Sequence, residues 1–527
     1  MLKHLLCIYL WLVATTAMTQ VSQNITLQGQ WATTGLRVFS GVTYNDIWGY
    51  VDGNQREYAI MGSIDYTHFI DVSDPQNPTQ IAQFDAPTGA IWRDFKTYLH
   101  YGFGVADDGN ATLQIFDLSG LPNTVTKVYD SDEFFSNCHN IFIDEAHARL
   151  YAVGASRADI VVLDLDPNPA QPTLLQNINL ADGYIHDIYV RDHLAYGSHV
   201  YRSKLSVYDL ADVDNVQKLG EINSDGLNHS SWLTKNGNTL IMADETHGTA
   251  LKVVNTEDLG DMEVVGTIKS TLLPNQNNSI PHNPFVIGND YVVISYYHEG
   301  VQIYNISDPA NPVRAGYYDT YPNNFNYSGF DGSWGVYPFL PSGNIIASDI
   351  DNGLFVLRPT FDMGYCRETI YYADSVSNEE MIDLQATESI SLRSGFEVEG
   401  GGTFSASIIP CTPPNNAVSN VADINYQNIK VPFIDNQLIS SAMDQQLRVA
   451  PNPFNDQFRL EIPEQFITEN VSIQLINPLG QIVVPSLVNC GERCLSVQVT
   501  SSWSGLYTIS IKNDRGAVLT KKVVKFQ

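Results

Sequence analysis

The chain has 527 residues, more than one ordinary hydrophobic core accommodates, so we expect several domains. Hydrophobic residues make up 43% of it and charged residues only 16%, with 37 Gly, 25 Pro and 28 Tyr, a composition that favours many short strands joined by tight turns. A formal charge of -30 would repel phosphate backbones and anionic lipid surfaces, so we expect no nucleic-acid partner.

Residues 1–20 have the pattern of a secretory signal peptide. A basic start, MLKH, precedes the apolar run LLCIYLWLVATTA, and small residues suited to cleavage follow between Ala17 and Gln20. The alternative is a membrane anchor, but the run is shorter than the roughly 20 residues that a spanning helix needs. We therefore expect cleavage and export, and no later segment of the sequence predicts a membrane span.

Cys7 lies within the apolar run. Export would place the five remaining cysteines in a compartment outside the cytoplasm, where disulfides persist. Cys366 and Cys411 bracket one small segment, and Cys490 and Cys494 lie four positions apart, so we expect both pairs to be bridged. Cys138 is left over, with two alternatives: a buried small apolar residue, which is the commoner fate, or a reactive thiol.

A repeated strand signature predicts the fold of the region from 21 to 360. It recurs at a spacing of roughly 43 to 53 residues, the range of β-propeller blades. The signatures are FID at 69–71, LQIFD at 113–117, IVVLD at 160–164, LSVYD at 205–209, LKVVN at 251–255, VQIYN at 301–305 and LFVLR at 354–358. Two apolar strands precede each signature and a fourth strand follows several of them, which is the strand count of a blade. The sequence therefore predicts an all-β, seven-bladed propeller.

The seventh repeat lacks a fourth strand of its own. The segment 24–31, NITLQGQW, resembles the fourth strands of the other repeats. We expect it to pair into the last blade and close the ring, because an open sheet edge invites aggregation.

The seven signatures resemble the LVIVD-repeat family of secreted propellers, and residues 21–360 as a whole are similar to the choice-of-anchor B proteins. That group shares a propeller that carries different surface-attachment tails. The resemblance implies a surface or secreted protein and no established biochemical activity.

Two shorter segments follow the propeller. Residues 361–412 are similar to the three-coathanger stack domain, particularly in SISLRSGFEVEGGGTFSASI, where Gly395, Phe396 and Phe404 match the pattern of that family. This resemblance implies a small β stack that acts as a spacer. Residues 413–445 are rich in Asn, Pro, Ser and Ala without a sustained period, which predicts a linker.

Residues 446–527 alternate apolar and polar positions, which predicts a small β-sandwich. Their motifs resemble the type A sorting domain of type IX secretion. The residues that carry this resemblance are Pro451, Asn452, Pro453, Phe454, the segment 477–481, Gly505, Leu506, Tyr507, Lys521, Lys522 and Lys525. It implies passage through the secretion machinery of a Bacteroidota-type bacterium, then tail removal and either attachment to the outer cell surface or release. An ordinary adhesion sandwich is the alternative.

A candidate site emerges where the repeats are aligned. The entrances of the seven first strands carry Trp48, Arg93, His139, His186, His229, His282 and Trp334. In a propeller the first strand lies innermost, and its entrance shares a face with the loop between the second and third strands. In the last three repeats that loop supplies Asp244, Glu245, His247, His298, Glu299, Asp349 and Asp351. The sequence therefore predicts that imidazoles and carboxylates converge on one rim.

Two interpretations of this rim stay open. Imidazole and carboxylate are the usual ligands of zinc and similar ions, which favours a metal or polar-ligand site. A residue that recurs once per blade is also explained by a histidine that hydrogen-bonds the neighbouring acidic loop of its own blade, and recurrence favours this architectural role. Five aromatic residues expected on the same rim either stack against sugars or belong to the core: Trp48, Trp92, Trp232, Tyr296 and Trp334.

The sequence contains none of the GxSxG, HExxH, GxxxxGK[ST] or strand-linked GxGxxG motifs, so no catalytic residue is predicted. We predict a secreted or cell-surface propeller that binds a protein, a glycan or an ion on one rim. The alternative is a metal-dependent hydrolase or lyase that uses the rim histidines and carboxylates. No cofactor is predicted, although a divalent metal ion would suit these side chains.

Overall fold

The computed structural model describes residues 22–408, apart from residues 88, 109–110, 273–278, 323–328, 366, 378–380, 394–395 and 401, and the strands between residues 448 and 525. The chain divides into two compact units, residues 1–417 and 418–527. The predicted signal peptide, the linker, the Cys366–Cys411 pair and the motif 451–454 lie outside the described residues.

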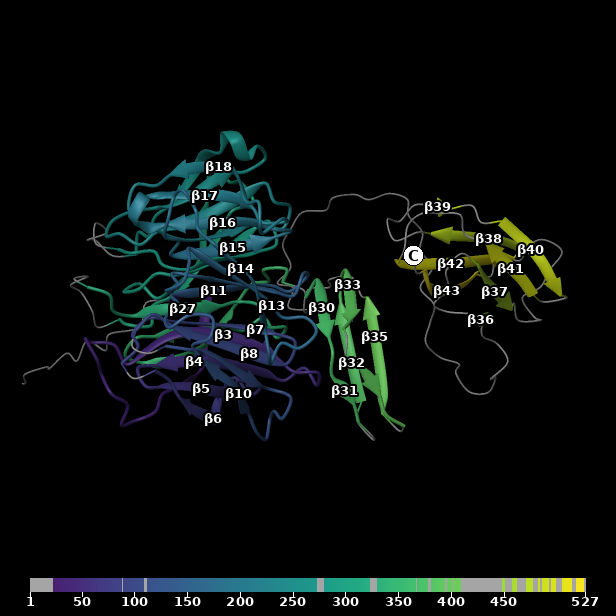
Figure 1. Ribbon diagram of the computed structural model, residues 1–527, viewed down its shortest axis with the longest axis horizontal. Helices are drawn as coiled ribbons and strands as arrows, with labels where there is room; N and C mark the ends of the chain where they lie inside the picture. The colour runs from purple at the N-terminus through teal and green to yellow at the C-terminus, as the bar shows by residue number, and fades with distance from the viewer. Residues whose placement is uncertain are drawn as a thin grey trace, which may run out of the picture. The chain divides into compact units, whose positions relative to one another are not determined.

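Seven antiparallel sheets among the described residues are the blades of a propeller, which confirms the predicted fold class (Figure 1). Blade 1 contains β3 (Tyr44–Val51), β4 (Glu57–Ser63), β5 (Tyr66–Asp71) and β6 (Thr79–Asp85). Blade 2 contains β7 (Arg93–Tyr98), β8 (Tyr101–Ala106), β9 (Leu113–Asp117) and β10 (Thr126–Ser131). Blade 3 contains β11 (Asn140–Asp144), β12 (Arg149–Val153), β13 (Ile160–Asp164) and β14 (Thr173–Ile178). Blade 4 contains β15 (Asp187–Arg191), β16 (Leu194–His199), β17 (Lys204–Asp209) and β18 (Gln217–Asn223).

The remaining blades follow the same order. Blade 5 contains β19 (Asn228–Leu233), β20 (Thr239–Asp244), β21 (Leu251–Asn255) and β22 (Glu263–Ile268). Blade 6 contains β23 (Pro284–Ile287), β24 (Tyr291–Ser295), β25 (Val301–Asn305) and β26 (Val313–Tyr318). Blade 7 contains β27 (Ser333–Tyr337), β28 (Ile345–Asp349), β29 (Gly353–Pro359) and, from the N-terminal side, β2 (Ile25–Trp31).

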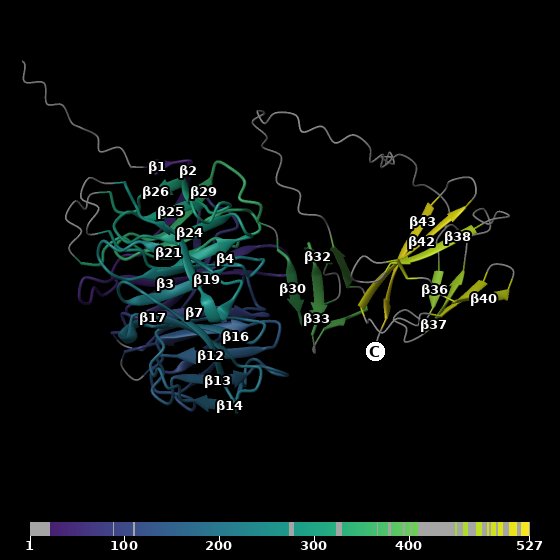
Figure 2. The ribbon, with the colours of Figure 1, turned by 90° about the horizontal axis from the view of Figure 1, so that it is seen from above.

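The first strand of each blade lies innermost, as predicted. The first strands of blades 1 to 6 contact one another in chain order, and β27 of blade 7 contacts β3 of blade 1. Figure 2 shows β14 of blade 3 at the opposite edge of the ring from β2 and β26. Helix is limited to two 3-10 turns in the described residues, η1 (Val200–Arg202) and η2 (Leu259–Asp261). Neither turn, and no other described segment, forms a helix of the length and apolarity that a membrane span requires.

The ring closes through the N-terminal segment, which confirms the predicted pairing. Strand β2 pairs antiparallel with β29, from Ile25 opposite Pro359 to Trp31 opposite Leu354. An additional strand, β1 (Ser22–Gln23), pairs with β26 and was not predicted. Asn24 joins the two strands at a φ of 55° and donates a hydrogen bond from its side chain to the Ala315 carbonyl. The N-terminal segment therefore ties blade 6 to blade 7.

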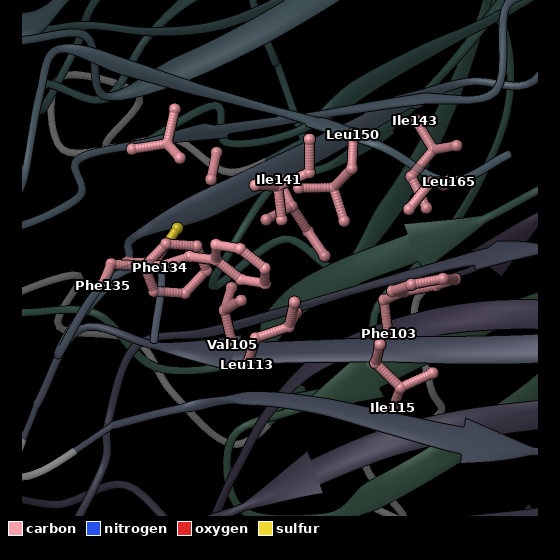
Figure 3. Close-up of a cluster of buried hydrophobic side chains, with 14 of the residues drawn as sticks. Phe103, Val105, Leu113, Ile115, Phe134, Phe135, Ile141, Ile143, Leu150 and Leu165 are labelled. Atoms are coloured by element: carbon pink, nitrogen blue, oxygen red, sulfur yellow. The ribbon is translucent and has the colours of Figure 1, made fainter. Parts of the chain in front are cut away.

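Apolar side chains on the faces of adjacent blades form the core between them. Figure 3 shows one such cluster, in which Phe103, Val105 and Leu113 of blade 2 face Ile141 and Leu150 of blade 3. The free Cys138 belongs to this cluster and is fully buried, so burial is confirmed as its fate. Successive side chains of a strand point to opposite faces of the blade, and each face packs on a neighbouring blade. Each strand therefore carries apolar residues for both faces, which is why the repeats could be recognised from sequence.

Three parallel strand pairs follow the propeller within the first unit. They are β30 (Thr369–Tyr372) with β33 (Ser389–Leu392), β31 (Ser375–Val376) with β34 (Glu397–Val398), and β32 (Met381–Ala386) with β35 (Thr403–Ile408). Their small core includes Ile370, Val376 and Leu384, with Phe396 and Phe404 packed at a ring separation of 4.7 Å.

The second unit contains two four-stranded sheets. One comprises β36 (Arg448–Ala450), β37 (Gln457–Glu461), β41 (Cys494–Gln498) and β40 (Ser486–Gly491). The other comprises β39 (Ile482–Val483), β38 (Val471–Ile476), β42 (Gly505–Asn513) and β43 (Val518–Lys525). Leu460, Val497 and Ile509, one or more in each sheet, are buried. The backbones of Cys490 and Cys494 lie in adjacent strands, and their disulfide stays a prediction.

Candidate functional site

Four histidines from four successive blades form a continuous row at one mouth of the central channel. The ring centroids of His139 and His186 are 4.0 Å apart, those of His186 and His229 4.4 Å, and those of His229 and His282 4.3 Å. Trp334 of blade 7 continues the row, 5.7 Å from His282. The predicted convergence of imidazoles on one rim is therefore present.

Backbone pairing with the second strand of each blade fixes the position of the histidines along the channel. The amide of His139 donates to the Val153 carbonyl, and that of His282 donates to the Ser295 carbonyl. Because both bonds extend the ladder by one step past the inner strand, the imidazoles project where the strand enters the channel. The Ser230 hydroxyl also donates to the His282 carbonyl across the gap between blades 5 and 6.

Trp48 does not lie at this level, which corrects its predicted alignment with the histidines. The Asp46 carboxylate accepts the amide of Phe95, just as the Asp94 carboxylate accepts that of Ile141. Asp46 and Asp94 are therefore equivalent, and the residue of blade 1 that aligns with the histidines is the one before Asp46, Asn45. Trp48 lies deeper in the channel, where its ring packs on Lys96.

Glu245 is the carboxylate that reaches the histidine row. It follows β20, and its Oε2 lies 3.9 Å from Nε2 of His229 while its Oε1 lies 3.7 Å from Nε2 of His282. The Tyr297 hydroxyl, from the equivalent loop of blade 6, donates to Oε1 of Glu245 at 2.7 Å. The loop of blade 5 thus places a carboxylate between two imidazoles, and the loop of blade 6 holds that carboxylate by a hydrogen bond. One atom each of His229, Glu245 and His282 that could ligate a metal ion lies within 4.8 Å of the other two.

Hydrogen bonds determine the tautomers of two histidines in the row. Nδ1 of His282 lies 2.5 Å from the Trp334 carbonyl oxygen, and Nδ1 of His139 lies 2.8 Å from Oδ2 of Asp107. A carbonyl can only accept, so Nδ1 of His282 carries the proton and its Nε2 presents a lone pair toward Glu245.

Burial favours the neutral form of three histidines in this row. Desolvation lowers the pKa of His282 to about 4 and holds the pKa values of His186 and His229 well below their ordinary range. Desolvation also raises the pKa of Glu245, partly offset by the hydrogen bond from Tyr297. Neutral imidazoles next to a carboxylate are the protonation states that a bound cation requires.

A ring of acidic and amide side chains lies one residue further along the inner strands. It includes Asp46, Asp94, Asn140, Asp187 and Asn283. Asp187 accepts a hydrogen bond from the Asn140 side chain, and burial raises the pKa of Asp187 to about 7. The sequence prediction did not include this ring, although an acidic or amide residue directly after the entrance residues of blades 2, 3, 4 and 6 was a visible signal.

The mouth cavity is small, with a volume of about 50 Å³, and six of the predicted rim residues line it: His139, His186, His229, His282, Glu245 and Trp334. Arg93, placed at the entrance of blade 2, also lines it, as does Trp92, whose side chain is 43% exposed. A volume of this size accommodates an ion or a few waters, whereas drug-sized ligands occupy about 300 Å³ or more.

The other predicted rim residues lie elsewhere. Asp244 is buried and accepts the Asp225 amide, because successive residues of a strand point to opposite faces and Glu245 takes the channel side. His298 and Glu299 are buried away from the mouth, the latter bonded to Ser279. His247, Asp349 and Asp351 also lie outside the mouth lining: His247 packs near Phe330, and Asp349 accepts the amides of the turn that contains Asp351.

The opposite end of the channel is aromatic. Trp48 and Trp232 lie there instead of on the histidine rim, and Tyr296 is a core residue. A cavity of about 620 Å³ opens at this end, with Phe142, Tyr189 and Phe339 among its lining residues. A second group of metal-ligating side chains, Asp144, His147 and His193, is carried by the end of β11 and the turns at this end of blades 3 and 4.

Fold and site together define an all-β protein built on a seven-bladed propeller with a polar channel mouth. The family model of the secretion system C-terminal sorting domain matches residues 448–525. The chain therefore carries a type IX secretion sorting domain, which implies interaction with that secretion machinery and placement at the cell surface or outside the cell. It is a secreted propeller protein.

Two solved structures are similar to part of the chain. A functionally unknown protein from Desulfotomaculum acetoxidans DSM 771 is 12% identical, with a TM-score of 0.41, over 55% of this chain and 89% of its own. A protein from Lactobacillus plantarum is 11% identical, with a TM-score of 0.44, over 58% of this chain and 89% of its own. No curated protein matches the chain.

Proposed function

We propose that this secreted propeller is a binding protein whose ligand docks at the histidine-lined mouth of the central channel. The observation that carries the proposal is the convergence there of four imidazoles, the Glu245 carboxylate and the exposed Trp92 ring. The sorting domain supports action outside the producing cell, where a protein, a glycan or an ion is available as ligand.

The resemblance to LVIVD-repeat and choice-of-anchor B proteins supports the same role. In that group the propeller is the shared element and the tails differ, so the propeller is the part expected to meet the ligand. A signal peptide at residues 1–20, a spacer at 361–412, a linker at 413–445 and origin in a Bacteroidota-type bacterium complete the proposal.

A metal-dependent hydrolase or lyase is the second candidate. The placement of His229, Glu245 and His282 within 4.8 Å favours it, because three protein ligands leave a coordination position for water or substrate. None of the described residues is assigned a catalytic role.

Thermal melting of the full secreted chain with a ligand panel tests the binding proposal. The panel holds divalent chlorides, mono- and disaccharides, amino acids and short peptides. We expect at least one compound to raise the Tm of the wild-type protein by mass action, and Trp92→Ala or His139→Gln to reduce that shift at least twofold. Trp232→Phe, at the other end of the channel, is the matched control. Hits that both mouth variants retain would contradict the proposal, as would a panel without any hit.

A further inference from the structure

We propose that His229, His282 and Glu245 bind a divalent transition-metal ion of the Zn²⁺ class at the base of the channel mouth. This inference rests on the proposed function, because it names the ligand that the mouth holds first. It assigns two Nε2 atoms and one carboxylate to the ion and leaves further positions open toward the solvent.

The distances between the three side chains fit a shared ion better than direct contacts. The two nitrogen–oxygen separations of 3.7 Å and 3.9 Å exceed the 2.7–3.2 Å of a hydrogen bond. Two ligands about 2.1 Å from one tetrahedral ion lie about 3.4 Å apart. Each of these two separations would therefore shorten by about half an ångström or less on coordination, and no two of the three ligand atoms lie more than 4.8 Å apart.

Hydrogen bonds outside the triad orient two of the three ligands. The Trp334 carbonyl accepts from Nδ1 of His282 and so directs the lone pair of Nε2 into the mouth. The Tyr297 hydroxyl holds the Glu245 carboxylate in place. A ligating histidine whose second nitrogen donates to a carbonyl, next to a hydrogen-bonded carboxylate, is the usual outer-sphere pattern of protein metal sites.

His229 supplies an independent observation, because its imidazole lacks the hydrogen bonds that burial demands. Its side chain is only 8% exposed, and no group among the described residues hydrogen-bonds its Nδ1. Its Nε2 faces Glu245 at a distance too long for a hydrogen bond. Buried polar groups in proteins nearly always have a partner, and the described residues hydrogen-bond neither ring nitrogen of His229. An ion at Nε2 would give the ring one partner, and Nδ1 would still need another.

Size and ligand chemistry select the class of ion. The cavity of about 50 Å³ at the base of the mouth holds an ion with its remaining waters, whereas a sugar or peptide would dock outside this cavity, against the exposed Trp92 ring. Two imidazoles and one carboxylate suit zinc and the neighbouring transition metals, whereas Ca²⁺ and Mg²⁺ prefer sites made only of oxygen atoms.

The group at the other end of the channel is a weaker candidate. Nδ1 of His147 already bonds Oδ2 of Asp144 at 2.8 Å, so those ligands satisfy each other. The His147 side chain is also 34% exposed. This group serves as the matched control.

Titration calorimetry of the metal-stripped full chain with Zn²⁺ tests the proposal. We expect one ion per chain, affinity reduced about 100-fold or more by His282→Gln, His229→Gln or Glu245→Gln, and about 10-fold by the positioning variant Tyr297→Phe. His193→Gln should leave the affinity unchanged, and Ca²⁺ and Mg²⁺ should bind at least 100-fold more weakly than Zn²⁺. Melting curves of the metal-free variants verify that each one folds.

Three results would overturn it: no Zn²⁺ binding by the wild type, equal binding by the three triad variants, or loss of binding in His193→Gln alone. If one of these results is obtained but a panel compound still raises the Tm in a way that requires Trp92, the channel mouth remains a binding site and only the metal-ion proposal is refuted. If zinc binds as expected but Trp92→Ala and His139→Gln change no ligand response, the triad is a metal site and the wider mouth is not a docking surface.

Discussion

A Cβ atom built on Gly29 would lie 2.3 Å from the carbonyl oxygen of Pro75. Gly29 belongs to β2, the closing strand of blade 7, and Pro75 lies in the turn between the third and fourth strands of blade 1. Contact between these two residues brings the N-terminal strand against the first blade at the point where the ring closes.

Replacement of Gly29 by valine therefore tests the closure. We expect Gly29→Val to destabilise the protein by about 2 kcal/mol or more, because backbone atoms must move to admit the side chain. The measurement is the Tm and the aggregation of the full chain, since displacement of β2 would uncover the edge of β29. Leu27→Ala, on the same strand at a side chain 40% exposed, is the control and should melt near the wild type. A Tm for Gly29→Val equal to that control would contradict the closure.

Asp349 predicts a pH dependence of stability in the turn of blade 7. Burial raises its pKa to about 7, whereas an unfolded aspartate titrates near about 3.9. The folded state therefore binds the extra proton between about pH 4 and 7, so this residue favours folding less and less as pH rises through that window.

Melting of Asp349→Asn at pH 5, 6, 7 and 8 measures this effect. The asparagine keeps the Oδ1 atom that accepts the amides of Asp351 and Asn352 and carries no charge. We expect the Tm of the variant relative to the wild type to rise with pH up to about 7 and then level off. Asp351→Asn, an exposed neighbour, should show a much flatter curve. A constant Tm difference for Asp349→Asn would refute the assignment.

Cys138 should be chemically inert in the folded protein. Its thiol is fully buried, lies 3.3 Å from the Asn140 carbonyl oxygen, and has a pKa raised well above the ordinary range by desolvation. Since thiolates are the reactive species, alkylation of the native chain followed by peptide mass spectrometry should leave Cys138 unmodified, and alkylation in denaturant should modify it fully. Rapid modification under native conditions would show that the cluster of Figure 3 opens.

The repeat pattern made most of the fold predictable. Signatures such as IVVLD at 160–164 sit on third strands buried on both faces, so their apolar runs repeat whenever a blade repeats. The closing strand was predictable because the seventh repeat visibly lacked a partner for β29. Strand β1 was not, since Ser22 and Gln23 carry no apolar pattern and pair only through their backbones.

The site was predictable only at the level of the rim. Blade 1 was misaligned because Trp48 was matched to the histidines, whereas the hydrogen bonds between neighbouring inner strands, which the sequence does not reveal, place Asn45 at their position. Of the three acidic loops, only the loop of blade 5 brings a predicted residue, Glu245, to the mouth lining, because side-chain directions depend on local strand register. Asp244 and Glu245 are neighbours with opposite directions, and only coordinates distinguish them.

Anomalous X-ray diffraction from crystals of the full chain grown with zinc would locate an ion bound by His229, His282 and Glu245. We expect one strong peak at the channel mouth, about 2.0–2.2 Å from Nε2 of His229, Nε2 of His282 and a carboxylate oxygen of Glu245. A map with no peak at the mouth, or with its strongest peak beside Asp144, His147 and His193, would contradict it.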